Sequence, residues 1–284
     1  YAAYHNPIML DVLPDKPTFQ SIAQGRAPAA QQKAPPLSSR LFEDTGLAIL
    51  RTHGDSSLVA AFSFGPYGGY HGHLDKLSFV LFGFGEELAV DPGRARTQGY
   101  RLPIHRDWYK ATLSHNAVIV DGQAQAPASG RIIAFTNTPQ LTAVVAECDQ
   151  AWPGVTQRRT LVLTAQYLLV FDDLVAKETH RFDWLYHNRG TNPIMAGSTP
   201  APEPAPGLVG AEYMREQRAF QTDTIIHAVF KGAGVDTHLA LAAGAGTSVL
   251  MADGPFGDVT ERVPLLAATR NGGHVRFLAV IAPV

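Results

Sequence analysis

The sequence of 284 residues contains a single cysteine, Cys148, and this scarcity excludes two kinds of architecture. One thiol forms no internal disulfide framework and supplies no cysteine-rich metal site. The ligands of any bound metal must therefore be His, Asp or Glu side chains. The sequence also has no run approaching the roughly 20 apolar residues that a helix needs to cross a bilayer, so we expect no membrane-spanning segment.

A strong excess of charge of either sign is missing as well. The formal net charge is −2 and charged residues make up 17% of the chain, so nothing attracts it to nucleic acid or to an anionic membrane. We expect neither partner. An anionic ligand would have to bind a local cluster of Arg, Lys and His. With 45% hydrophobic residues, the chain can bury a large core, in one large β domain or two smaller ones.

The two ends of the chain differ in composition. The first residues carry no basic and apolar export signal and read like the middle of a longer protein. Residues 22–39 are rich in Ala, Gln and Pro without apolar periodicity, which is typical of a linker. We therefore predict that residues 1–40 are the end of a preceding domain and a linker, and that residues 41–284 form one domain.

Short apolar runs, rich in Val, Ile, Leu, Phe and Thr and bounded by Gly, Pro, Asn or Asp, fill the rest of the sequence. This pattern predicts an all-β fold, a large antiparallel β-sandwich, and not a βαβ fold. The clearest runs are 46–52, 58–64, 78–82, 116–120, 141–148, 160–164, 167–172, 224–230, 237–243 and 275–281. The proline-dense segment 198–207 is predicted to be an exposed loop, because proline lacks a ladder donor.

The most informative polar segment is His71-Gly72-His73-Leu74-Asp75. In an extended chain, residues two apart share a face, so both imidazoles and the carboxylate would project the same way, with Gly72 leaving room for close approach. Such an edge can transfer protons or bind a metal. A His or Asp beside a glycine turn more commonly caps or hydrogen-bonds the backbone, so this segment does not decide between the two interpretations.

Two later blocks supply matching groups. Asp91 follows a hairpin, and simple pairing arithmetic places it opposite Ser78, so it meets His73 only if the His-Gly-His segment curls back, which its glycines permit. His115 lies just before an apolar strand. Two histidines and one carboxylate with an open fourth position are a common zinc set, and His73, Asp91 and His115 satisfy it. Asp91-Pro-Gly by itself is typical of a turn.

Taken together and in this order, the polar blocks resemble the heparinase II/III-type polysaccharide lyases, and among them the oligoalginate lyases. The resemblance covers most of the chain beyond about residue 41. The blocks are His71-Gly-His73-Leu-Asp75-Lys-Leu, Glu87-Leu-Ala-Val-Asp91-Pro-Gly, Tyr100-Arg-Leu-Pro, Trp108-Tyr-Lys-Ala-Thr and Ser114-His115-Asn116-Ala-Val-Ile-Val-Asp121-Gly. The resemblance implies the C-terminal β-sandwich of a lyase whose N-terminal half is a helical α/α toroid, with the active site shared between the two.

The same resemblance implies roles for several residues. His71 matches a histidine that helps the active site, so we predict that it is catalytic. His73, Asp91 and His115 match the residues that hold zinc in some members, in a structural or supporting role. The family's catalytic tyrosine and its Asn/His pair that engages the substrate carboxylate would come from the toroid.

A second tyrosine, used by some oligoalginate lyases, falls at Trp108 in this chain, with Tyr109 beside it. We predict Tyr109 as a second catalytic residue, although composition alone favours core or rim aromatics at both positions. Tyr100, Arg101 and Arg106 are predicted to bind substrate, although solvated surface charge explains the two arginines equally well.

The sequence thus predicts a lyase that cleaves uronic-acid-containing glycans by β-elimination, with alginate or oligoalginate preferred. The predicted partners are an acidic polysaccharide or oligosaccharide and the helical toroid of the same protein, and the expected location is periplasmic or secreted. Three alternatives stay open: a heparin or heparan sulfate lyase of the same family, a non-catalytic carbohydrate-binding β-sandwich, and a metal-dependent hydrolase.

Overall fold

The computed structural model divides the chain into two compact units, Tyr1–Ser38 and Ser39–Val284. It describes residues 37–52, 58–95, 101–191, 193–196, 199–200, 207–242, 244 and 246–284. Most of the predicted linker, and Tyr100 among the predicted substrate contacts, lie outside these residues. Within the described part, no helix is long and apolar enough to cross a membrane.

The first sheet contains five strands in sequential order, β1-β2-β3-β4-β5, all paired antiparallel. Burial alternates along its strands, as in β3, where every second residue faces the core. The strands are β1 (Arg40–Phe42), β2 (Leu47–Arg51), β3 (Leu58–Ser63), β4 (Ser78–Gly83) and β5 (Glu86–Ala89).

The second sheet has twelve strands, and its main path runs β11-β14-β15-β17-β10-β9-β8-β7. Two short chains of strands branch from the long strands β10 and β17: β6 pairs with β10, while β16, β13 and β12 extend from β17. The strands are β6 (Val118–Val120), β7 (Arg131–Asn137), β8 (Leu141–Cys148), β9 (Val155–Thr164), β10 (Leu168–His187), β11 (Ile194–Ala196), β12 (Thr199–Pro200), β13 (Arg215–Thr222), β14 (Ile226–Phe230), β15 (Thr237–Leu241), β16 (Thr247–Phe256) and β17 (Asp258–Pro283).

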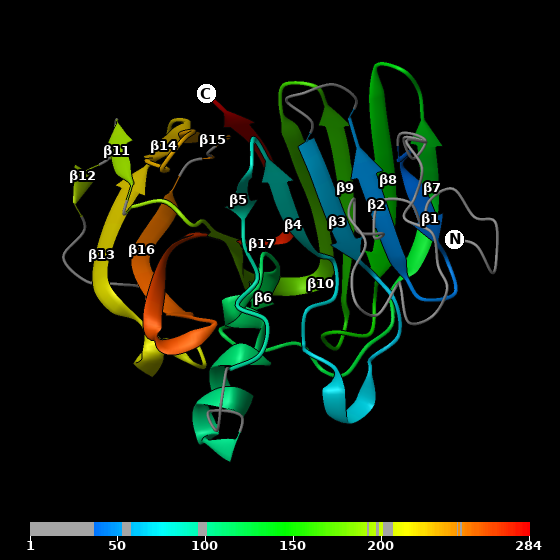
Figure 1. The fold of residues 1–284 in the computed structure, drawn as a ribbon. Coiled ribbons are helices and arrows are strands. Elements are labelled where there is room, and N and C mark those ends of the chain that lie inside the picture. The colour runs from blue at the N-terminus through cyan, green and yellow to red at the C-terminus, as the bar shows by residue number, and fades with distance from the viewer. Residues whose placement is uncertain are drawn as a thin grey trace, which may run out of the picture. The chain divides into compact units, whose positions relative to one another are not determined.

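The two sheets pack face to face, with β2 and β3 against β8 and β9 (Figure 1). Their inner side chains form one continuous core, to which β3 contributes Phe62, β8 Val144 and β9 Leu161. The predicted all-β, antiparallel sandwich is therefore confirmed, and each of the ten predicted runs overlaps a strand.

Two features differ from the prediction. β10 continues past Asp172 for fifteen more residues, through a bulge between Val175 and His180, because its distal half is buried between β6 and β17. The segment predicted as a proline-rich loop begins with a two-residue strand, β12, which pairs only with β13. Pro200 is tolerated there because an edge strand has a side that needs no donor.

Among the described residues, four short helical turns connect these strands: η2 (Gly69–His71), η4 (His105–Tyr109), η5 (Thr112–Ser114) and η6 (Ala211–Tyr213). A second core cluster lies beneath η4 and η5, where Trp108 and Leu113 pack with Leu185 and Leu265 from the long strands. This cluster fixes the turns that precede β6, and those turns carry the two polar blocks that begin at Trp108 and Ser114.

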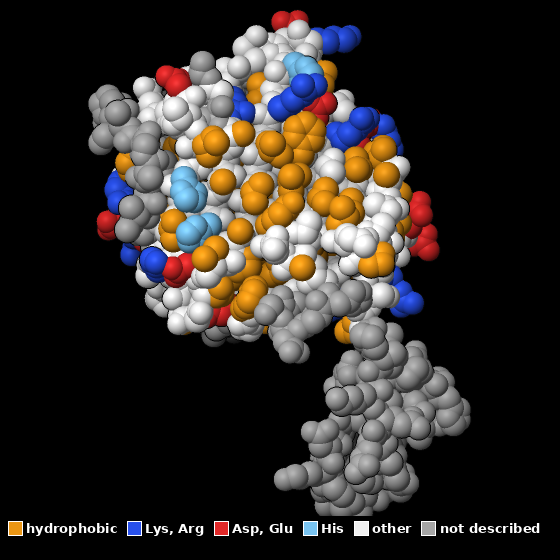
Figure 2. Space-filling model, turned by 90° about the horizontal axis from the view of Figure 1, so that it is seen from above, with side chains coloured by type: hydrophobic (Ala, Val, Ile, Leu, Met, Phe, Trp, Pro, Cys, Tyr) orange, Lys and Arg blue, Asp and Glu red, His pale blue; other side chains and the backbone are white. Residues whose placement is uncertain are grey.

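Hydrophobic side chains also reach the surface. On the face that Figure 2 shows, they gather over the middle, and most of the Lys, Arg, Asp and Glu side chains lie towards the edge. Over half of a folded protein's surface is ordinarily apolar, so single exposed aliphatic residues such as Leu278, 41% exposed, need no special explanation.

Candidate functional site

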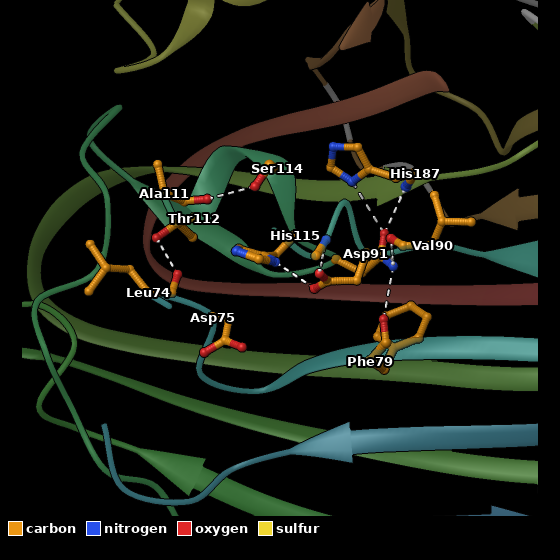
Figure 3. Close-up of polar contacts among 12 residues, drawn as sticks. Leu74, Asp75, Phe79, Val90, Asp91, Ala111, Thr112, Ser114, His115 and His187 are labelled. Atoms are coloured by element: carbon orange, nitrogen blue, oxygen red, sulfur yellow. Dashed lines mark hydrogen bonds and ion pairs between the residues drawn. The ribbon is translucent and has the colours of Figure 1, made fainter. Parts of the chain in front are cut away.

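Three of the predicted polar residues converge at one end of the sandwich. His73 follows η2, Asp91 follows β5 and His115 follows η5, and one possible ligand atom from each lies within 4.8 Å of the others. The Nδ1 atom of His115 is 2.6 Å from an Asp91 carboxylate oxygen, and Figure 3 shows the two side chains pointing toward each other. The imidazole rings of His73 and His115 are 5.3 Å apart. The predicted convergence is thus present in the structure.

The chain reaches this arrangement by a different local path from the one predicted. The segment around His71 is not extended: η2 is a 3-10 turn in which the Gly72 nitrogen donates to the Gly69 carbonyl at 3.0 Å. His71, His73 and Asp75 therefore do not share one strand face. Asp75 pairs instead with Lys76 at 3.0 Å and stays outside the cluster.

Gly72 is needed at this turn for reasons of space. A Cβ atom there would lie 2.6 Å from the Gly68 nitrogen and 2.8 Å from the Tyr67 ring, closer than real Cβ contacts allow. The predicted close approach at Gly72 is present, but what approaches is this turn's own backbone and the Tyr67 ring. Folding back in this way brings His73 toward Asp91.

The register near Asp91 also departs from simple hairpin arithmetic. A bulge lies between the pairs Leu81–Ala89 and Phe82–Glu87, so the pairing beyond it shifts by one residue. The ladder ends at Ala89, and Asp91 lies beyond it with no strand partner, so the prediction that it stands opposite Ser78 is wrong. This release from the ladder leaves the Asp91 side chain free to turn toward His115.

Asn116 holds the site together from within. Its side-chain amide donates to the carbonyls of Phe79 and Val90 at 2.8 and 3.0 Å, and its oxygen accepts from the His187 backbone nitrogen at 2.7 Å. These bonds join β4, the residue before Asp91 and the end of β10 at a fully buried position next to His115. Asn116 therefore fixes the relative positions of two cluster residues.

A further set of bonds ties the His73 segment to the turn that bears His115. The Leu74 nitrogen donates to the Lys110 carbonyl at 2.9 Å, and the Thr112 hydroxyl donates to the Leu74 carbonyl at 2.7 Å (Figure 3). Neither contact involves a cluster side chain, so one backbone bond and the Thr112 hydroxyl keep His73 close to His115 independently of the cluster itself.

The cluster perturbs the titration of its members. Burial alone would raise the pKa of Asp91 and lower that of His115, but their mutual attraction and hydrogen bond outweigh it. The pKa of Asp91 falls to about 2, and that of His115 rises above its ordinary value. Burial, together with the charge of His115, lowers the pKa of His73 to about 4, so that imidazole is neutral near pH 7.

The donor set fits a divalent transition metal. Two imidazoles and a carboxylate are the ligands that zinc takes when a fourth position stays open. The Nε2 atom of His115 is buried and has no hydrogen-bond partner among the described residues. An imidazole nitrogen left without a partner in the interior costs free energy that a bound cation would offset. The structure thus supports a His/Asp metal-binding triad without identifying the metal.

A cavity of about 690 Å³ adjoins the triad. Among the residues described along its wall there are seven basic side chains and no carboxylate, although the chain as a whole is slightly acidic. The lining residues are Tyr67, Tyr70, His71, His73, Leu74, Arg94, Arg101, Leu102, Pro103, His105, Arg106 and Lys110. The three arginines and the lysine among them form the local cationic cluster that an anionic ligand requires.

The other predicted site residues divide into two groups. His71, Arg101 and Arg106 line the cavity, and Arg106 is also paired with the neighbouring Asp107. Tyr109 is fully buried in the second core cluster and does not line the cavity, so substrate cannot reach it in this arrangement. Trp108 is buried beside it and donates its indole N–H to the Pro255 carbonyl at 2.8 Å.

Five aromatic or basic residues of the cavity were not predicted as site residues: Tyr67, Tyr70, Arg94, His105 and Lys110. Burial, reinforced by Lys110 and Arg94, lowers the pKa of His105, which favours a neutral imidazole in the cavity. Lone histidines and aromatics in irregular segments give no periodic signal. The available sign was their place beside, between or within the polar blocks that begin at His71 and end at Gly122.

Comparison with known proteins agrees with this geometry. The family model described as "Heparinase II/III-like, C-terminal" matches residues 34–247. An alginate lyase of Stenotrophomonas maltophilia is 32% identical over 136 residues, which are 42% of this chain and 18% of that protein. An exo-oligoalginate lyase of Saccharophagus degradans is 36% identical over 61 residues, covering 19% of this chain and 8% of that protein.

A solved heparan sulfate lyase of Pedobacter heparinus has the same fold. It superposes with a TM-score of 0.70 at 17% identity, covering 93% of this chain and 38% of that chain. The matched region is therefore less than half the length of each of these three proteins.

Proposed function

This chain belongs to the heparinase II/III-like C-terminal family, a family of polysaccharide lyases, and from that premise we propose that it cleaves uronic-acid-containing glycans by β-elimination. Alginate or oligoalginate is the preferred substrate, because two of the sequence relatives, each more than 30% identical over the matched residues, are an alginate lyase and an exo-oligoalginate lyase. The observation that carries the proposal is the cavity whose described walls bear basic groups and no carboxylate, directly beside the His/Asp triad.

The reaction needs positive charge at the substrate carboxylate. Removing the C5 proton of a uronate puts negative charge onto that carboxylate, so hydrogen-bond donors and cations placed there stabilise the transition state. The electron pair of the C5–H bond forms the C4–C5 double bond, and the C4–O4 bond breaks with its pair on O4. An acid then protonates O4, and the product is an unsaturated sugar.

Within this scheme, His71 is the proposed catalytic residue of this chain. It lies in the exposed η2 turn at the cavity wall, where its imidazole can donate to the carboxylate of a bound uronate. Arg101 and Arg106 are proposed to hold neighbouring carboxylates. Tyr109 has no part in the proposal because it is buried away from the cavity.

We assign His73, Asp91 and His115 as the residues that would hold zinc. A divalent ion bound there supplies positive charge and cross-links three chain segments. Asp91 holds the buried His115 ring through its hydrogen bond to Nδ1, and the ring in turn keeps the carboxylate ionised. His73 presents a neutral imidazole, the form that binds a metal.

The base that takes the C5 proton is proposed to come from a helical toroid of the same protein, by analogy with the family. The active site would then lie between that domain and the cavity described above. Acidic polysaccharides are extracellular substrates, so a periplasmic or secreted location is part of the same proposal.

The test is a panel of alginate, heparin, heparan sulfate, chondroitin and hyaluronan incubated with the full-length protein. A lyase yields products that absorb near ~232 nm, the band of a conjugated uronate, and mass spectrometry shows no added water. Saturated products carrying one water would establish a hydrolase instead, and glycan binding without products would establish a binding module.

Two variants separate the proposed roles. We expect His71→Ala to fold and keep its metal while losing most activity, and His115→Ala to lose metal, measured by elemental analysis after dialysis. Full activity in folded His71→Ala would remove that residue from the mechanism, and an unchanged metal content in His115→Ala would remove the assigned triad.

A further inference from the structure

Tyr70 is the most exposed large apolar side chain among the described residues, at 85%. It lies in η2, next to His71, on the wall of the cationic cavity. A tyrosine ring held almost entirely in water gains nothing for folding, since stabilisation follows the apolar area that is buried. Its exposure at a cavity wall points to a ligand.

The ring is nevertheless held in place. The Lys110 ammonium donates to the Tyr70 carbonyl at 2.6 Å and lies 5.5 Å from the centre of the ring, within range of a cation–π interaction. The His71 imidazole packs at right angles to the ring with centroids 5.3 Å apart. Two neighbours therefore fix the ring while leaving most of its surface open, so a ligand that binds it orders few additional torsions.

Tyr70 and the cavity cations are placed to contact different parts of a uronate sugar. A pyranose ring carries its carboxylate on one edge and presents C–H groups on its faces. The cavity offers cations for the edge, among them Arg101 and Lys110, and Tyr70 offers a flat apolar surface for a face. Ligand sites generally combine such an apolar surface with a few placed polar groups.

We propose that Tyr70 is a stacking platform for one sugar of the uronate chain, next to the sugar whose carboxylate the cavity cations hold. This inference rests on the proposed function and adds a residue that binds substrate without taking part in bond breaking. The phenol hydroxyl is not required for this role, whereas the ring is.

The test compares Tyr70→Phe, Tyr70→Trp and Tyr70→Ala in the full-length protein, with alginate tetrasaccharide as the probe. Removing the ring is expected to raise KM and the calorimetric Kd about five- to tenfold, the range of a single aromatic contact, with kcat unchanged within about twofold. The Phe and Trp variants are expected to keep wild-type values. Phe82→Ala, which removes a 47% exposed ring outside the cavity wall, is the matched control.

Each contrary result has a distinct meaning. Wild-type KM and Kd in Tyr70→Ala would overturn the platform while leaving the lyase proposal intact. A loss of kcat in Tyr70→Phe would overturn it in favour of an acid–base role for the hydroxyl. Loss of thermal stability in Tyr70→Ala, with its KM and Kd unchanged, would make Tyr70 a packing residue. A wild-type protein that neither binds nor cleaves any uronate glycan would instead overturn the proposed function.

The link to Lys110 is tested by a double-mutant cycle. If Lys110 acts partly by orienting the ring, Lys110→Met raises Kd less in the Tyr70→Ala background than in the wild type. Fully additive effects would show that Lys110 binds the glycan without orienting Tyr70, and the platform would then lose its proposed anchor.

Discussion

At the scale of single residues, His187 is a buried histidine that lies beside the triad without being part of it. It is 1% exposed, and burial, reinforced by the nearby charge of His115, lowers its pKa to about 3. Its backbone nitrogen is held by Asn116, so the ring stays in the interior beside the triad. His187 is therefore neutral in the folded protein throughout the physiological range.

This gives a pH prediction with a definite sign. In the unfolded chain His187 titrates near 6.5, so below that pH the unfolded state binds a proton that the folded state does not. Its contribution to stability is present above pH 6.5 and is lost as the pH falls toward 3. Between pH 7 and pH 5 we expect the wild type to lose roughly 2 kcal/mol more than His187→Gln. Urea unfolding with a chelator present measures this, and parallel pH profiles would refute it.

At the scale of elements, one buried ion pair joins the strands that support the site. The Arg159 guanidinium on β9 donates to both carboxylate oxygens of Asp172 on β10, at 2.8 and 2.9 Å. A further nitrogen donates to the carbonyls of Leu77 and Asn116 at 2.6 Å. Both ion-pair side chains are 0% exposed. Through these bonds Arg159 connects strands β9 and β10 to the backbone at Leu77 and Asn116, close to the triad.

Adjacent positions on β9 allow a matched comparison. Arg159→Ala leaves the Asp172 carboxylate buried without its partner, and we expect it to lower the free energy of unfolding by about 3–5 kcal/mol. Arg158→Ala removes an arginine that is 51% exposed, and its buried partner Glu147 keeps its ion pair with Arg131, so we expect a loss of about 1 kcal/mol or less. Chemical denaturation of both variants tests the contrast, which similar losses would contradict.

At the scale of the whole molecule, charge is distributed unevenly. The chain carries a net charge of −2, yet the described wall of the cavity bears three arginines and one lysine. Long-range attraction of an anionic glycan is therefore expected at this region. Such attraction is screened by salt, with a Debye length of about 10 Å at 0.1 M.

We accordingly expect KM for a uronate polymer to rise with ionic strength while kcat changes little. Arg101→Gln is expected to raise KM at low salt and to flatten the dependence of log KM on log salt. Arg218→Gln, an exposed arginine of β13 outside the cavity wall, should leave both unchanged. Equal slopes in wild type and Arg101→Gln would show that the cavity charge does not attract the glycan.

The all-β class and the identity of the triad could be predicted from the order of residue types alone. Alternating burial is a local property of period two, so runs such as 58–64 could be identified without coordinates. His73, Asp91 and His115 could be named because residue type limits the possible metal ligands.

Which side chains come into contact, and which of them a substrate can reach, depends on the folded chain. The bulge beside Leu81, the 3-10 turn before Gly72 and the burial of Tyr109 all depend on contacts between segments distant in sequence. Periodicity carries no record of such contacts, since a register shift of one residue or a turn in a glycine-rich segment leaves the pattern of residue types unchanged. For the same reason, the exposure of the Tyr70 ring could not be predicted from the sequence.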